Sequence, residues 1–386
     1  MLAVSRPPPP SPYYTVEHDA FRTTLRGFVS REIAPYAEAW DEAKTFPREL
    51  YRKAGEVGLL GLSFPEEHGG TPADPFYAII ACEELARPGA GGISASLMSH
   101  TIAVPPIARL GSRALQAKVI PSTLRGETIA ALAITEPSGG SDVASLRTTA
   151  RRDGDFFVVN GSKTFITSGI RADFYTVAVR TGGEGMGGIS LLLIEKGTPG
   201  FSATPLEKMG WWASDTATLY FDGCRVPAAN LIGEENQGFL GLMLNFNSER
   251  LGLAANACAF AQVCYEEAVA WAQERVTFGR PLITRQVIRH KLIDMRMRIE
   301  STKAFLESVA WLVMQGESPV PEICMLKNHA VECLEHCAGE AVQILGGAGY
   351  IRGAKCERIY RETKVLAIGG GASEIMKDLA ARQLGW

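Results

Sequence analysis

Apolar residues recur at helical spacing through the first third of the chain. Phe21, Leu25 and Phe28 stand four and three positions apart, which places their side chains on one side of a helix. The string PEEHGGTP at 65–72 is rich enough in glycine and proline to predict an irregular loop. The pattern therefore predicts a helical domain over residues 15–128, divided at Pro35, Pro47 and Pro65.

Short β-rich runs replace the helical spacing between residues 129 and 235. The run FFVV is followed by Asn160-Gly161, a pair that accepts the positive φ angles of a tight type I′ turn and so predicts a hairpin at that point. Two further runs, at 189–195 and 217–227, are rich in β-branched, aromatic and leucine residues. We expect a barrel-like β domain in the middle of the chain.

Long helical patterns fill the remainder of the chain, residues 236–386. Ile288, Leu292, Met295 and Ile299 recur at spacings of four, three and four, which marks a helix with one buried stripe. Several such segments with short connections are typical of an antiparallel four-helix bundle. A chain of 386 residues is long enough for two or three domains. The expected fold is α+β, with the β domain between two helical domains.

Composition and charge argue against a membrane span, a nucleic-acid partner and a bound metal. Residues 1–14 contain four consecutive prolines and no hydrophobic signal core, so we expect a disordered tail there. No segment approaches about 18 uninterrupted apolar residues, so no membrane span is expected. A net charge of −3 offers no basic excess for a nucleic acid. The eight cysteines lack the spacing of a metal site, which favours reduced thiols in the cytoplasm and no bound metal.

Four sequence blocks carry the candidate chemistry. ITEPSGGSD at 134–142 is followed, in order, by RVTFGRPL, QILGGAGY and IGGGASEIMKDLAAR. LGGAGY does not suit a dinucleotide-binding GxGxxG loop, because it ends a predicted helix instead of following a strand. In this order the blocks resemble those of the FAD-dependent acyl-CoA dehydrogenases, over about Val16 to Gly385. The resemblance implies the three-domain fold of that family and an enzyme that desaturates an acyl-CoA thioester between its α and β carbons.

The resemblance implies FAD as the cofactor and assigns contacts to it. Thr135 should hydrogen-bond the flavin, and Ser141 should contact the pyrophosphate and the substrate. Phe165 and Thr167 should cover the ring. A bound flavin needs hydrogen bonds at its ring edges, donors to its pyrophosphate and an apolar wall. Ordinary turn chemistry for Thr135 and Ser141, and a place in the β core for Phe165, are the alternative interpretations.

A second group of positions matches family residues that reach the FAD of a neighbouring subunit. The resemblance therefore implies a homo-oligomer, expected to be a tetramer built on the C-terminal helices. An arginine offers a charge-assisted bond to phosphate, and paired glycines let a backbone approach a cofactor closely. A helix-terminal arginine and a glycine C-cap are the alternatives. The group comprises Arg275, Phe278, Gln343, Gly346 and Gly347.

Removal of the α proton requires a carboxylate beside the thioester. Many family members carry that glutamate in the last block, where this chain has Gly370. In isovaleryl-CoA and long-chain acyl-CoA dehydrogenases the glutamate instead precedes an arginine on a C-terminal helix, and Glu249-Arg250 matches that string. The resemblance thus implies Glu249 as the base, Arg250 as an ordering charge, and the Gly370 N–H as a donor to the thioester carbonyl.

Alternatives remain for the base and for the function. A surface ion pair is the other interpretation of Glu249, whereas Glu374 looks like a first-turn helix glutamate. The acyl pocket is expected to include Leu97, Met98 and Phe246 and to accept a branched or longer chain. An electron-transfer flavoprotein is the expected acceptor. The same resemblance covers acyl-CoA oxidases, nitroalkane oxidases and flavin monooxygenases, and a non-catalytic flavoprotein module is a further alternative.

Overall fold

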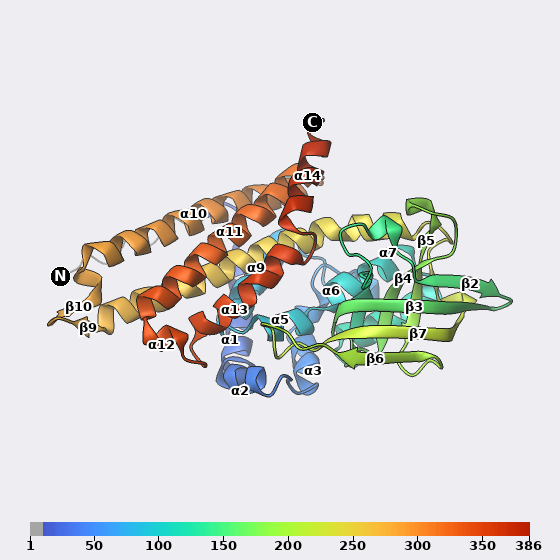
Figure 1. Cartoon of the computed structure of the whole chain (residues 1–386), viewed down its shortest axis with the longest axis horizontal. Coiled ribbons are helices and arrows are strands. Elements are labelled where there is room, and N and C mark those ends of the chain that lie inside the picture. Colours follow the sequence, from blue (N-terminus) through green and yellow to red (C-terminus); the bar gives the residue numbers. More distant parts are fainter. Residues whose placement is uncertain (1–10) are drawn as a thin grey trace.

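The computed structural model describes residues 11–386, in which a helical half and a β half lie end to end (Figure 1). The helix α9 (Gly238–Glu274) runs from the β half into the helical half and joins the two. Most of the predicted proline-rich tail lies outside the described residues. Within them, the Tyr13 ring stacks on Phe76 with 5.4 Å between centroids, and Tyr14 meets the same ring edge-on.

The N-terminal region is helical, as its spacing predicts. Leu25 and Phe28 are buried, and Phe21 packs beside them against the same core. The Asp74 side chain caps one helix by accepting from the Phe76 N–H at 2.8 Å. The helices are α1 (Val16–Glu32), α2 (Ala37–Glu42), α3 (Glu49–Glu56), α4 (Pro75–Ala86), α5 (Gly91–Leu97), α6 (His100–Ala103), α7 (Pro105–Leu110) and α8 (Arg113–Leu124).

The middle region forms one sheet of eight strands. Its strands follow the order β6-β7-β3-β2-β4-β5-β8, and β1 pairs with β4 in parallel. The strands are β1 (Ala130–Ala133), β2 (Thr149–Asp153), β3 (Phe156–Thr167), β4 (Phe174–Arg180), β5 (Ile189–Glu195), β6 (Phe201–Pro205), β7 (Thr216–Pro227) and β8 (Leu231–Ile232).

The hairpin predicted at Asn160-Gly161 is wrong. The turn lies earlier, around Gly154, and β3 continues through the pair with an irregular register on β7. Gly161 has a φ of +142°, and a Cβ there would lie 2.7 Å from the Thr148 Cα. The glycine therefore serves close packing at a bulge, and the Asn160 side chain accepts from the Gly223 N–H of β7.

The C-terminal region is a helical bundle around α9 and α11 (Figure 1). Leu292, Met295 and Ile299 of the predicted stripe are buried, and Ile288 packs beside them. The elements after α9 are β9 (Val276–Thr277), β10 (Arg280–Pro281), α10 (Gln286–Met314), α11 (Val320–Leu345), α12 (Gly347–Tyr350), α13 (Lys355–Ile368) and α14 (Ser373–Gln383). The predicted α+β order of helices, sheet and helices is confirmed.

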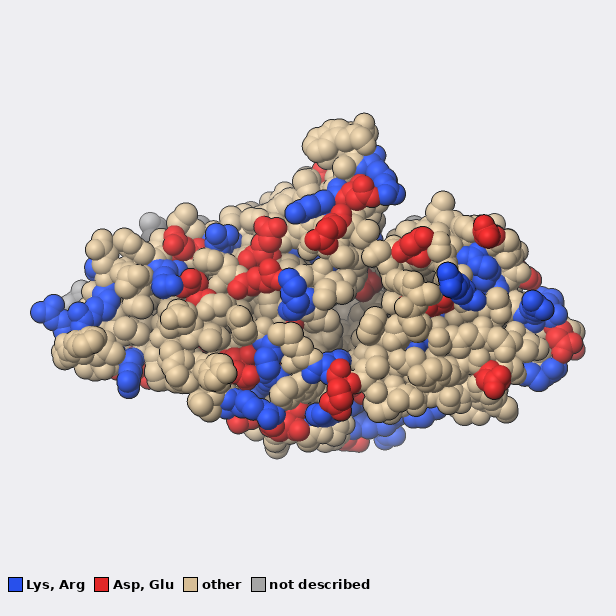
Figure 2. All heavy atoms as spheres, in the orientation of Figure 1, with Lys and Arg blue, Asp and Glu red and all other residues tan. Residues whose placement is uncertain are grey.

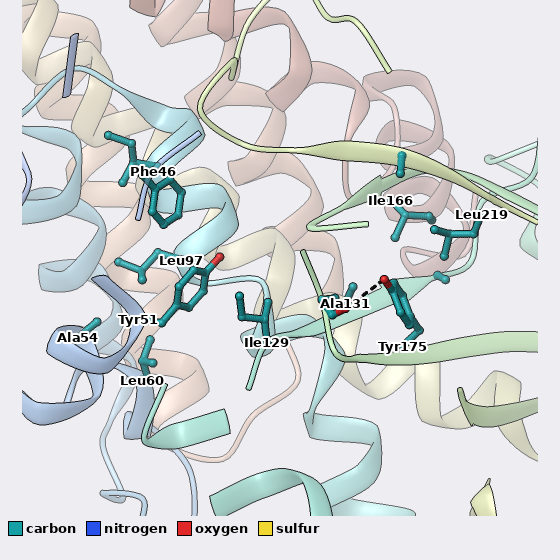
Figure 3. Packing of buried hydrophobic residues seen from close by; sticks show 14 of the residues in the cluster. Phe46, Tyr51, Ala54, Leu60, Leu97, Ile129, Ala131, Ile166, Tyr175 and Leu219 are labelled. Carbon is teal, nitrogen blue, oxygen red and sulfur yellow. Dashed lines mark hydrogen bonds between the residues drawn. The ribbon is translucent and has the colours of Figure 1, made fainter. Parts of the chain in front are cut away.

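A continuous apolar core connects the N-terminal helices to the sheet. Figure 3 shows Tyr51 and Leu97 of the helices in the same cluster as Tyr175 of β4. Both tyrosine hydroxyls are satisfied inside it, that of Tyr51 by the Ser96 carbonyl at 3.0 Å and that of Tyr175 by the Gly169 carbonyl at 3.0 Å. None of the helices within residues 11–386 is long and apolar enough to cross a membrane.

Candidate active site

Glu249 lies near the start of α9, beside the loop that joins α13 to α14. A Cβ placed on Gly370 in that loop would lie 3.7 Å from the Glu249 Oε1 atom. The two positions at which a glutamate base is expected in the family therefore converge on one point. Burial raises the pKa of Glu249 to about 7, against the opposing charges of Arg250 and Lys327. A carboxylate with this pKa suits proton abstraction near neutral pH.

The glycine loop has a conformation that side chains seldom adopt. Gly370 and Gly371 have φ angles of +66° and +106°. Arg250 Nε donates to the Gly370 carbonyl at 3.1 Å, and Lys327 Nζ donates to the Gly371 carbonyl at 2.5 Å. Within residues 11–386, the Gly370 N–H has no hydrogen-bond acceptor. The loop thus holds its carbonyls on two cations and leaves a donor available to a ligand.

The block ITEPSGGSD forms a loop anchored by a buried ion pair. Lys163 Nζ lies 2.8 Å from Glu136 Oε1, and both side chains are almost wholly buried. Glu136 also accepts from the backbone N–H groups of Arg147 at 2.6 Å and Thr148 at 2.8 Å. Burial alone would raise the pKa of Glu136, but the Lys163 ammonium and these donors lower it to about 2. The loop is therefore fixed to β3 by charge-assisted hydrogen bonds.

The predicted flavin-contact residues of the first group lie on this loop and on the adjoining strand. The Thr135 carbonyl accepts from the Thr164 N–H of β3 at 2.8 Å. Phe165 has a φ of +61° at a break in the β3 register, and the residue is 69% exposed. A positive φ in an aromatic residue is strained, and such strain often marks a functional position. Thr167 ends the same strand.

Hydrogen bonds bring this strand end next to the predicted acyl pocket. The Ser168 hydroxyl donates to Ser96 Oγ at 3.3 Å and to Ser99 Oγ at 3.2 Å, on either side of Leu97 and Met98. Asn245 of α9 donates to the Ile102 carbonyl at 2.8 Å, which ties the start of α9 to α6. The surface is hollowed where the helical half meets the β half (Figure 2).

The predicted pocket residues differ in their surroundings. Leu97 is fully buried in the apolar core, where it packs near Tyr51 (Figure 3). Met98 is half-buried at the margin of the same core. Phe246 is half-buried, one turn before Arg250, whose guanidinium lies 5.4 Å from its ring centroid.

The second group of predicted FAD residues lies at the other end of the bundle. At about 1.5 Å per helical residue, Arg275 is roughly 40 Å from Glu249 along α9. Phe278, in the β9–β10 hairpin, is 95% exposed. Gln343 is exposed near the end of α11, and Gly346, with a φ of +60°, and Gly347 follow it. One chain therefore does not bring this group to Glu249.

Two functional candidates on α11 were not found by sequence reasoning. Lys327 is 0% exposed and Asn328 is 7% exposed, and the Asn328 side chain donates to the Ser373 carbonyl at 2.9 Å. Both side chains therefore hold the loop beside Glu249. The sequence contains one indication of a buried lysine. Cys324, Lys327 and Val331 stand three and four positions apart, so the lysine falls on an apolar helix face. A lysine in such a stripe is rare without a partner.

Most of the chain matches known proteins. Residues 15–127, 131–224 and 236–385 match the N-terminal, middle and C-terminal domains of acyl-CoA dehydrogenase. An acyl-CoA dehydrogenase of Bacillus subtilis is 39% identical over 96% of this chain and 99% of its own length. The chain belongs to the acyl-CoA dehydrogenase family. It is thus an oxidoreductase of the acyl-CoA dehydrogenase type.

Further relatives support the same assignment. The mitochondrial long-chain specific acyl-CoA dehydrogenase of Rattus norvegicus is 38% identical over 96% of this chain and 87% of its own length. A crystal structure from Mycobacterium smegmatis, described as an acyl-CoA dehydrogenase, is 49% identical with a TM-score of 0.95, and the match covers 97% of this chain and 99% of that one. The predicted family and its three-domain fold are confirmed.

Acyl-CoA dehydrogenases depend on FAD, and a glutaryl-CoA dehydrogenase of Mycobacterium smegmatis with 27% identity and a TM-score of 0.91 was solved in complex with FADH2. The residues of this chain fit such a group. Phe165 offers an exposed aromatic face, and the Thr135 and Ser141 hydroxyls have no hydrogen-bond partner within residues 11–386. An apolar wall beside available donors is what a flavin requires. FAD is therefore the cofactor of this acyl-CoA dehydrogenase.

Proposed function

We propose that this enzyme converts an acyl-CoA thioester to the trans-2-enoyl-CoA, with Glu249 as the base that removes the α proton. The convergence of Glu249 and Gly370 on one point carries the proposal, because it lets a relocated carboxylate reach the same carbon. The pKa of about 7 adds support, since a half-ionised carboxylate accepts a proton readily at neutral pH.

Each residue of the site has a distinct task. Glu249 Oε1 takes the α proton, and the Gly370 N–H donates to the thioester carbonyl as negative charge develops on its oxygen. Arg250 holds the Gly370 carbonyl and so fixes the peptide plane between Gly370 and Gly371. Bound FAD supplies the acceptor for the hydride of the β carbon. Thr135, Ser141, Phe165 and Thr167 would hold it, and Ser141, Leu97, Met98 and Phe246 would contact the substrate.

The decisive experiment compares Glu249→Gln with Glu374→Gln. Glu374 is exposed on the first turn of α14, so it serves as a matched control close to the same loop. We expect Glu249→Gln to retain FAD and to lose flavin bleaching by acyl-CoA about 10²- to 10⁴-fold under anaerobic conditions. Glu374→Gln should bleach like the unaltered enzyme. Near-normal bleaching in Glu249→Gln would remove Glu249 from the role of base.

A panel of straight and branched acyl-CoA thioesters in the same assay would identify the substrate, for which we propose a branched or longer chain. The panel also separates the alternatives. A non-catalytic module would bleach with none of them, and an oxidase would turn over rapidly in oxygen without another acceptor. We propose an electron-transfer flavoprotein as the acceptor, so turnover should depend on adding one or on an artificial dye.

We also propose a cytoplasmic homotetramer. The predicted FAD-contact residues at the far end of the bundle support association of subunits. Arg275 and Phe278 lie too far from Glu249 to serve the same site within one chain. Eight unpaired cysteines are consistent with a reducing compartment. Light scattering after size-exclusion chromatography would give the oligomeric state. A monomer that retained full FAD and activity would contradict the shared-site proposal.

A further inference from the structure

Lys327 is a buried cation close to the proposed base, with no part in the proton transfer itself. Its side chain is fully buried on α11, and its ammonium has no carboxylate within ion-pair distance among residues 11–386. Its hydrogen bond goes instead to the Gly371 carbonyl at 2.5 Å. A buried ammonium without an ion-pair partner is costly, so the fold tolerates a charge at this point at the expense of stability.

The charge lies where the reaction needs one. Arg250 and Lys327 hold the carbonyls of successive residues, Gly370 and Gly371, from two different helices. A trans peptide directs its N–H opposite to its C=O, so anchoring these two carbonyls also fixes the directions of the Gly371 and Ala372 N–H groups in the same peptide planes. Glu249, on the turn of α9 that carries Arg250, faces the same loop.

We propose that Lys327 is a positioning residue for the base, whose ammonium fixes the Gly370–Gly371 loop and stabilises the ionised carboxylate of Glu249 across it. The inference rests on the proposed role of Glu249. It adds a second cation on a separate helix, so that the base does not depend on Arg250 alone. Lys327 acts through Glu249 and the loop and does not itself exchange a proton with the substrate.

The charges around Glu249 agree with this role. Burial raises the pKa of Glu249, whereas Arg250 on α9 and Lys327 on α11 both lower it. Burial, with the repulsion of Arg250, lowers the pKa of Lys327 to about 8, so the ammonium is mostly protonated at neutral pH. The other titratable group that acts on both cations is Cys324, whose pKa burial raises, so its thiol stays neutral. Removal of the Lys327 charge should therefore leave Glu249 protonated to higher pH.

The test replaces Lys327 in the FAD-loaded enzyme and follows flavin bleaching against pH, with an acyl-CoA that the unaltered enzyme oxidises. In Lys327→Met the acidic limb of the profile should move up by about 1 pH unit, so that below the limb the bleaching rate, relative to the variant's own alkaline plateau, is about tenfold lower. Lys327→Arg, which keeps the charge, should keep the limb. Asn328→Ala is the matched control, because it removes a neighbouring loop hydrogen bond without removing a charge. A looser loop would slow bleaching equally at every pH and leave the limb in place.

A second measurement does not depend on turnover. Difference infrared spectroscopy of the ligand-free protein, with Glu249→Gln to identify the band, gives the titration midpoint of the Glu249 carboxyl, which should rise in Lys327→Met. If Lys327→Met does not fold, Lys327→Arg provides the test. The charge is retained in that variant, so a shifted titration midpoint of Glu249 would overturn the proposal. An unshifted midpoint in folded Lys327→Met overturns it as well. Either result would remove only the role of Lys327, provided that flavin bleaching is lost in Glu249→Gln. Normal bleaching in Glu249→Gln would instead contradict the proposed function itself.

Discussion

At the scale of single residues, the surroundings of Gly370 limit which side chains can stand opposite Glu249, the proposed base. A Cβ on Gly370 would lie 3.7 Å from Glu249 Oε1 but only 2.5 Å from Leu253 Cδ1, at a φ of +66°. A side chain at this position would therefore be strained and would displace the end of a flexible leucine. The positive φ and the close approach of Leu253 therefore favour glycine at this position.

This geometry predicts the result of moving the base back to the loop. Glu249→Gly combined with Gly370→Glu should regain part of the bleaching rate that Glu249→Gly loses, because the new carboxylate enters the same space. Adding Leu253→Ala should raise the recovered rate, since it removes the 2.5 Å contact. Stopped-flow reduction by acyl-CoA measures all three. A folded triple variant no faster than Glu249→Gly would show that the two positions are not interchangeable.

The sequence alone singles out the proposed base, Glu249, but not the residues that surround it, and the reason is physical. The Glu249-Arg250 string and Gly370 stand in the printed sequence, and their resemblance to family blocks was sufficient to single them out. The partner of Lys327, by contrast, is a backbone carbonyl 44 residues further along the chain. Nothing in residue type identifies a carbonyl as a ligand, so only the packing of α11 against the loop before α14 shows what this lysine does.

At the scale of elements, long-range packing overrode a strong local signal. Asn160-Gly161 suits a tight turn, yet the close approach of Thr148 and the pairing of β3 with β7 keep the strand extended through it. The same strand carries Lys163, whose pairing with Glu136 fixes the first family block. The order of helices and strands could be predicted from periodicity, whereas the register of β3 depends on contacts that no local pattern contains.

The buried pair should therefore control both stability and cofactor binding. Lys163→Met leaves the Glu136 carboxylate buried without its cation, and we expect it to lower the free energy of unfolding by about 3 kcal/mol and to weaken FAD binding. Lys118→Met is a matched control, because Lys118 and its partner Glu195 are 43% and 40% exposed. Loss of this exposed ion pair should lower the free energy of unfolding by less than about 1 kcal/mol. Denaturant unfolding and FAD titration would measure both, and equal effects of the two substitutions would contradict an anchoring role.

At the scale of the whole molecule, the three regions meet around one glycine. The Gly91 N–H at the start of α5 donates to Glu362 Oε2 of α13 at 2.8 Å, and the Trp211 N–H donates to the other oxygen at 3.2 Å. Nearby, Asp41 of α2 accepts from the Ala213 N–H at 3.3 Å. Buried polar contacts thus join the N-terminal helices, the segment between β6 and β7, and the C-terminal bundle, and they fix the β half relative to α9.

Gly91→Ala tests whether this junction holds the active site together. The added Cβ would lie 2.6 Å from Trp211 Nε1 and 2.9 Å from Glu362 Oε2, so the side chains at this junction would have to shift. We expect a lower thermal midpoint and slower flavin reduction, because the β half shifts against the helix that carries Glu249. Gly339→Ala, within α11 and with no atom within 4 Å of its Cβ, should be neutral or stabilising by up to about 1 kcal/mol. If Gly91→Ala unfolded at the midpoint of the unaltered enzyme and kept its bleaching rate, the junction would tolerate displacement and the position of Glu249 would depend on α9 alone.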